Sequence, residues 1–177
     1  MKKYSLFFLL LVFAKLSVGQ QVIISGVANN RLLTWNDFSG KPDKKSEHEA
    51  NTFWKINYSY TGVIFQGDSA KLKGLSVKLE LDAGQSWIKP GKETTNLLKH
   101  EQGHFDVGLI CLKEMIEKLN NTLFYKQDIS AKVQNLFYEI LNKHMLMNKQ
   151  YDKETDHSKK KEEQEKWNLF FTNELNR

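Results

Sequence analysis

The residues that could do chemistry are concentrated in the stretch LLKHEQGHFDV, residues 97–107. His100 and His104 stand four residues apart, and Glu101 directly follows the first histidine. On a helix, residues four apart lie on one face, so both imidazoles can bind one zinc ion at about 2.0–2.1 Å. Glu101 then lies beside the ion, where it can take a proton from a water whose pKa zinc lowers to about 7. This HExxH pattern predicts a zinc hydrolase with Glu101 as general base.

The pattern is short, and the alternative is a helix with two solvent-facing histidines. The apolar residues around it independently predict a helix, which favours the metal site. Gly103, a poor helix former that costs about 1 kcal/mol relative to alanine, stands between the two ligands and lets another backbone approach closely. Asp106 could orient a ligand imidazole, although a solvated aspartate explains it equally well.

A catalytic zinc normally has three protein ligands and one open position, so a third ligand must come from elsewhere. The stretch YDKETDHS, residues 151–158, gathers the candidates. We rank His157 first because neutral imidazole is the commonest ligand, then Glu154 as the alternate, then Asp152.

Three further polar or aromatic residues have competing interpretations. Tyr151 could stabilise the oxyanion of a tetrahedral intermediate, although a tyrosine packed on the helical hairpin explains it equally well. His48 lies in a charged loop and is interpreted as solvated. His144 lies on the inner face of a predicted helix and is interpreted as a core histidine.

The first 19 residues predict a signal peptide. Lys2 and Lys3 precede a short apolar run, and Ser17-Val18-Gly19 supplies small residues for cleavage near Gly19–Gln20. The apolar run is too short to cross a hydrocarbon core of about 30 Å, but an uncleaved membrane anchor is the alternative. The sequence therefore predicts a secreted or periplasmic protein, with no stable membrane insertion after cleavage.

Composition narrows the function classes. Three of the 26 basic residues fall in the signal peptide, which leaves 23 against 21 acidic residues and a net charge near +2. This charge is too small to indicate a nucleic-acid partner. The single cysteine, Cys111, cannot form an internal disulfide and falls among apolar residues, which indicates a buried, inert thiol.

The hydropathy pattern predicts one α+β domain over residues 20–177, with a small antiparallel sheet, then the active-site helix, then a C-terminal helical hairpin, as in zincins. Alternating apolar residues predict strands in FWKINYSYTG and GLSVKLELD, and QVIIS and RLLTW are strand-like. Residues 37–49 are expected to form a loop. Helical spacing predicts helices over 94–120, with Thr94 or Thr95 as N-cap, over 130–147, and in SKKKEEQEKWNLFFTNEL.

Three stretches, LTWNDFSGKPD, SWIKPGKETTNLLKHEQGHFD and YDKETDHSKKKEEQEKW, together resemble the bacterial secreted family called domain of unknown function 922. The resemblance covers nearly the whole mature chain. It implies a zinc-dependent peptidase of unsettled substrate, a role that for the family itself rests on the same HExxH motif. The resemblance carries over His100, Glu101 and His104 as the HExxH set, and Tyr151, Asp152, Glu154, Thr155, His157 and Ser158 as a second signature.

The leading hypothesis is an exported zinc metallopeptidase that acts on peptide or protein substrates in the cell envelope. A strand edge, such as that of residues 75–81, could hold an extended substrate. One alternative keeps the zinc but assigns it to a non-peptide amide or ester, or to zinc binding alone. Another is a non-catalytic envelope binding module that uses the aromatic face of Trp54, Tyr58 and Tyr60.

Overall fold

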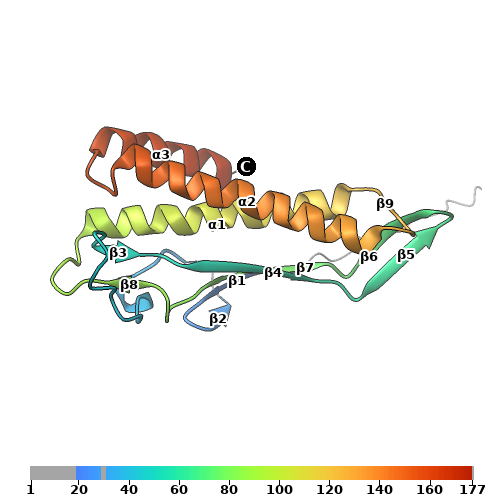
Figure 1. Cartoon of the computed structure of the whole chain (residues 1–177), viewed down its shortest axis with the longest axis horizontal. Helices are drawn as coiled ribbons and strands as arrows, with labels where there is room; N and C mark the ends of the chain where they lie inside the picture. The colour runs from blue at the N-terminus through green and yellow to red at the C-terminus, as the bar shows by residue number, and fades with distance from the viewer. Residues whose placement is uncertain (1–18, 29–30, 177) are drawn as a thin grey trace, which may run out of the picture.

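The computed structural model describes residues 19–28 and 31–176. Three helices lie together on one side of the molecule, and the strands form a layer beneath them (Figure 1). Most strands precede the first helix, which confirms the predicted α+β class. The predicted signal peptide falls almost entirely on residues outside the described part. The elements are β1 (Gly19–Ile24), β2 (Val27–Ala28), η1 (Trp35–Asp37), β3 (Ala50–Asn51), β4 (Trp54–Ser59), β5 (Gly62–Gln66), β6 (Ser69–Lys73), β7 (Ser76–Leu81), β8 (Trp87–Ile88), α1 (Thr95–Asn121), β9 (Phe124–Tyr125), α2 (Ile129–Thr155) and α3 (Lys161–Leu175).

The main sheet has the strand order β2-β1-β7-β4, so β7 lies in its interior. The inward residues Val77, Leu79 and Leu81 of β7 are buried, as the alternating pattern predicts. The expectation that residues 75–81 form a free edge is wrong, because β7 pairs with a strand on each side. The pairing of β1 with β7 is parallel rather than antiparallel. The long stretch of chain between them supplies the crossover that a parallel pair requires.

The predicted strand in RLLTW is wrong: its last residue begins the 3-10 helix η1, and the residues before it are irregular. Asp37 fixes the backbone of this segment, because its carboxylate accepts hydrogen bonds from the backbone N and the hydroxyl of Thr34. Arg31 also donates two hydrogen bonds to the same carboxylate. Local bonds of this kind compete with a sheet ladder for the backbone.

Helix α1 lies directly against the sheet. Its N-cap is Thr94, whose side chain accepts a hydrogen bond from Leu97 N at 3.2 Å, as predicted. At Gly108, an added Cβ would lie 3.0 Å from Leu79 Cδ1 and from Trp54 Cδ2, so a larger residue would require these side chains to shift. The buried face of α1 forms the centre of the core with β4 and β7.

Helix α2 runs eight residues beyond the predicted end at residue 147. Its last turns therefore return beside the first turns of α1, where both histidines of the HExxH motif lie (Figure 1). The aromatic face offered above as a binding surface packs beneath these helices instead. Trp54 is buried, and the rings of Tyr58 and Phe137 lie 5.0 Å apart.

A smaller sheet with strand order β5-β6-β9 forms the opposite end of the molecule from α3 (Figure 1). Strands β5 and β6 are joined by a tight turn in which Gly67 has a φ of 61°. Within the described ranges, no helix combines the length and apolarity that crossing a bilayer requires.

The Asp37 cluster generates a prediction about acid stability. Burial alone would raise the pKa of Asp37, but hydrogen bonds from Arg31, Ser25 and Thr34 hold it well below its ordinary value. Because the unfolded-state pKa is about 3.9, this stabilisation is complete above that value and is lost as the pH falls below it. Asp37→Asn should lower the free energy of unfolding by about 2–3 kcal/mol at pH 7 and by less at pH 3.

Urea denaturation at the two pH values measures this difference. The exposed Glu139→Gln on α2 is the matched control and should change neither value. An equal loss for Asp37→Asn at both pH values would contradict the assignment.

Candidate metal centre

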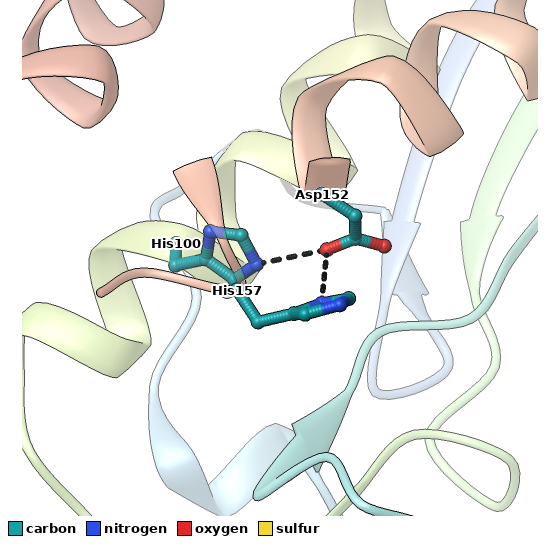
Figure 2. Close-up of side chains that lie close together, drawn as sticks. All are labelled: His100, Asp152 and His157. Atoms are coloured by element: carbon teal, nitrogen blue, oxygen red, sulfur yellow. Dashed lines mark hydrogen bonds and ion pairs between the residues drawn. The ribbon is translucent and has the colours of Figure 1, made fainter. Parts of the chain in front are cut away.

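Three histidine nitrogens converge on one carboxylate oxygen at the meeting point of α1 and α2. Asp152 Oδ1 lies 3.2 Å from His100 Nε2, 3.1 Å from His104 Nε2 and 3.0 Å from His157 Nδ1. One atom from each of His100, Asp152 and His157 lies within 4.8 Å of the other two. Figure 2 shows the carboxylate of Asp152 between the two rings. The structure thus brings together all three histidines that the sequence singled out as ligands.

The helical register of α2 selects among the carboxylates of the YDKETDHS stretch. Asp152, ranked last from the sequence, lies at the centre of the cluster. Glu154, the predicted alternate, is two residues further and points elsewhere, because two helical steps turn a side chain through about 200°. Its carboxylate accepts hydrogen bonds from Gln150 Nε2 and Trp167 Nε1, both at 2.8 Å.

A closed ring of hydrogen bonds fixes the orientation of the His100 imidazole. Its Nδ1 lies 3.0 Å from Gln164 Oε1, and Gln164 Nε2 donates to the hydroxyl of Tyr151 at 2.6 Å. That hydroxyl donates in turn to the backbone carbonyl of His100 at 3.1 Å. Since the amide nitrogen is committed to Tyr151, the amide oxygen faces Nδ1, which must carry a proton. Nε2 is then the atom of His100 left to face Asp152.

His104 is held in the same way. Its Nδ1 lies 3.0 Å from Asn148 Oδ1, so Nε2 again faces Asp152. Asn148 and Asp152 are four residues apart on α2, just as the two histidines are on α1. Two faces with the same helical spacing therefore meet across the centre.

These contacts can be satisfied in two ways. Without a cation, both nitrogens of the His104 ring face an oxygen atom, so that ring satisfies both contacts only when it carries two protons. Burial opposes the charged form of His104, but the Asp152 and Glu101 carboxylates together raise its pKa to about 9. The charged His104 ring would then lie against the His100 ring, with ring centroids 4.9 Å apart. With a cation, each Nε2 offers a lone pair, and no like charges are opposed.

The donor set and its spacing fit zinc. Zinc binds imidazole nitrogen and carboxylate oxygen at about 2.0–2.2 Å, which places two ligands of a tetrahedral site about 3.3 Å apart. The three nitrogen-to-oxygen distances of 3.0–3.2 Å at Asp152 are close to that separation. His100, Asp152 and His157, whose donor atoms lie within 4.8 Å of one another, are the residues that would hold the ion, and His104 Nε2 lies against the same Asp152 oxygen.

His157 reaches the centre from a strained segment. Helix α2 ends at Thr155, and Asp156, His157 and Ser158 all have positive φ values, of 46°, 52° and 77°. Non-glycine residues visit this left-handed region at a cost of roughly 1–2 kcal/mol each. Strain of this kind is retained where the surroundings impose it, commonly at functional sites.

Tyr151 is a packing and positioning residue here rather than a free hydroxyl. Its side chain is fully buried, and both hydrogen bonds of the hydroxyl are made inside the protein. Its ring stacks on His100 with centroids 4.7 Å apart. The role of oxyanion donor predicted from the sequence does not fit this position. Gly103 makes room for the ring, since an added Cβ would lie 2.6 Å from Tyr151 Cζ and 2.9 Å from Phe171 Cε2.

Glu101 is buried beside the centre and is oriented from the sheet. Its Oε2 accepts a hydrogen bond of 2.6 Å from the hydroxyl of Thr52, which lies between β3 and β4. A second, longer contact joins the same hydroxyl to the backbone carbonyl of Glu101. The general-base candidate is thus fixed by a residue that no sequence pattern indicates.

Of the remaining candidates, one lies at the rim of the centre and the others lie elsewhere. The exposed His48 contacts His157, with ring centroids 4.2 Å apart, so it belongs to the rim of the centre. Asp106 instead accepts from Gln102 at 2.8 Å, and burial raises its pKa to about 6. His144 is a core histidine, as predicted, with its Nδ1 2.9 Å from the Ile140 carbonyl oxygen. Cys111 is buried, also as predicted.

The close fit at Gly103 generates a prediction. Gly103→Ala must displace Tyr151 or Phe171, and overpacking of this kind costs about 1–3 kcal/mol, against a helix-propensity gain of about 1 kcal/mol. We expect a net loss of about 1 kcal/mol in the free energy of unfolding and a weaker affinity for Zn²⁺, because His100 stacks on the displaced ring. Thermal denaturation and zinc titration measure both effects.

Gly62→Ala, at a position with no atoms within 4 Å of the added Cβ, is the control and should leave zinc affinity unchanged. Unchanged zinc affinity in Gly103→Ala would show that the Tyr151 contact does not position the ligand.

Comparison with known proteins gives a family. Searches of curated proteins and of solved structures return no match. Residues 24–158 match the family described as bacterial protein of unknown function (DUF922), and this match includes the HExxH motif and every residue of the YDKETDHS stretch. Because the match covers well over half of the chain, the protein belongs to the DUF922 family.

Proposed function

We propose that this protein is an exported zinc-dependent hydrolase that cleaves peptide bonds. The observation that carries the proposal is the fixed orientation of two imidazoles. His100 and His104 each commit Nδ1 to an amide oxygen and direct Nε2 at the same point. In zinc sites, a ligand histidine commonly donates a hydrogen bond from one ring nitrogen, and this bond orients the other nitrogen toward the metal.

Each residue around the centre has a separate role in the proposed hydrolysis. Zinc, when bound, supplies a Lewis acid that polarises a carbonyl and makes water acidic. Glu101 takes a proton from the attacking water and then delivers it to the leaving amine. Thr52 holds the Glu101 carboxylate in position for both transfers. Glu101 is buried, so bulk water has little access to its carboxylate.

A free sheet edge near Glu101 supports a peptide as the substrate. In the described part of the chain β4 is the last strand of its sheet, so its outer edge has no strand partner. Thr52 precedes β4 by two residues and contacts Glu101. An extended peptide that adds to this edge by backbone hydrogen bonds would be led past the general base. The signal-like N-terminus supports a peptide or protein substrate in the cell envelope.

Zinc content tests the ligand set. The chain starting at Gln20 should bind one zinc ion, measured by elemental analysis after reconstitution and dialysis. His100→Ala and His104→Ala should abolish binding, and Asp152→Ala and His157→Ala should each weaken it by at least about 100-fold, since each removes a donor atom from the ion.

Glu154→Ala is the matched control, because it removes a carboxylate from the same turn of α2 that points away from the centre. It should retain zinc at the wild-type affinity. Loss of zinc in this variant, or full retention in Asp152→Ala, would overturn the assignment.

Glu101→Gln tests the general base. The variant should keep one zinc ion and lose about 10²–10⁴-fold in the rate of peptide cleavage, because proton transfer by a positioned side chain contributes that much. The assay uses a mixture of fluorescence-quenched peptides, with Thr52→Val as a milder companion variant. Wild-type turnover by Glu101→Gln would rule out Glu101 as the base.

Assays of simple esters and non-peptide amides beside the peptides separate peptide hydrolysis from the alternative reaction. Full zinc occupancy with turnover of simple esters or non-peptide amides, but not of any peptide, would assign the centre to that substrate class instead.

A further inference from the structure

The end of the molecule formed by β5, β6 and β9 exposes large apolar side chains. Ile64 is 45% exposed and Phe65 is 50% exposed, both on the edge strand β5. On and beside β9, Leu123 is 50% exposed and Tyr125 is 42% exposed. We refer to these four residues as the apolar tip. The strand register places Ile64 and Tyr125 on the face of the sheet that carries Lys71, and Phe65 on the opposite face with Ala70. Exposed apolar side chains therefore project from both faces of this one small sheet, which isolated exposed residues would not do.

Lysines surround the apolar tip. Lys71 is exposed and stands directly opposite Ile64 in the strand register, and Lys73 stands opposite Gly62. Lys126 Nζ lies 5.8 Å from the centre of the Phe65 ring. The acidic residues on these strands and turns are Asp68 and Asp128, and Asp128 pairs with Lys132 at 3.2 Å. The tip therefore carries an excess of positive charge.

We propose that the apolar tip binds the surface of an anionic phospholipid membrane. Aromatic and aliphatic side chains enter the boundary between headgroups and acyl chains, while neighbouring lysines extend to the phosphates. Acidic lipids attract basic segments in this way, and the charge of the tip complements them.

The position of the tip fits this role. It lies beyond the C-terminal end of α1, whereas the metal centre lies near the N-terminal end of α1 (Figure 1). From His104 to the end of α1 at Asn121 the helix rises by roughly 25 Å. A chain attached by its tip would hold the centre that far from the lipid, exposed to the aqueous side. The proposal stands on the tip alone and does not depend on zinc or hydrolysis.

Vesicle sedimentation tests the proposal directly. The probes are vesicles of phosphatidylglycerol with phosphatidylethanolamine, and vesicles of phosphatidylcholine alone, each mixed with the chain starting at Gln20. A lysine near an anionic surface contributes roughly fivefold to binding, so Lys71, Lys73 and Lys126 together predict about 100-fold stronger binding to the anionic vesicles at low salt. High salt should remove most of this preference.

Two double variants separate the apolar and the charged parts. Ile64→Ser with Phe65→Ser should reduce binding to anionic vesicles at least tenfold, and Lys71→Glu with Lys126→Glu should remove the preference for anionic lipid. The matched control is Leu169→Ser with Lys161→Glu on α3, at exposed positions away from the tip, which should bind as the wild type does. Circular dichroism confirms that each variant is folded.

Three outcomes would overturn the proposal: no binding to anionic vesicles, equal binding to neutral and anionic vesicles, or tip variants that bind as tightly as the control. In the first case, the exposed tip would instead serve a protein partner. A chain with the single change Gln66→Cys, labelled there with an environment-sensitive dye, provides a second readout. The emission of the dye shifts only if the turn between β5 and β6 enters the lipid boundary.

Discussion

The metal centre depends on one steric constraint, the contact of the Tyr151 ring with Gly103. Helices α1 and α2 can approach closely here only because residue 103 of α1 is a glycine and has no side chain. The approach places Asp152, the next residue on α2, among the imidazoles of α1. It also closes the hydrogen-bonded ring through Gln164 that fixes the proton on His100. Packing and donor orientation therefore have the same cause.

The charged groups around the candidate centre bear on whether it could hold a cation. Burial would raise the pKa of Asp152, but hydrogen bonds from His100 and His104 lower it well below its ordinary range, so the carboxylate is charged. Glu101 adds a second carboxyl group close enough to raise the pKa of His104. A divalent ion held by the Nε2 atoms of His100 and His104 would place a positive charge beside the half-buried Asp152 and the buried Glu101.

Sequence patterns predicted most features that depend on local spacing, except the wrong strand in RLLTW, and they failed where distant segments decide. The HExxH pair, the N-cap at Thr94 and the buried face of β7 follow from periodicity alone. Choosing Asp152 over Glu154 required knowing that α2 stays helical through residue 155, because that register decides which carboxylate faces α1. Thr52 contacts Glu101 across a sequence separation of 49 residues, and Gln164 contacts His100 across 64. Contacts over such separations leave no local pattern in the sequence.

The four candidate donors are not equivalent, and their difference bears on whether the proposed zinc ion would be structural or catalytic. A structural zinc has four protein ligands, whereas a catalytic zinc keeps one position open. His100 and His104 lie on a long helix and are locked through Nδ1, and Asp152 lies within the last turns of another helix. His157 alone comes from a left-handed segment outside a helix, and its side chain is 37% exposed. Moving it would relieve backbone strain rather than break a helix, so under the proposed function His157 would be the ligand that substrate displaces at the lowest cost in free energy.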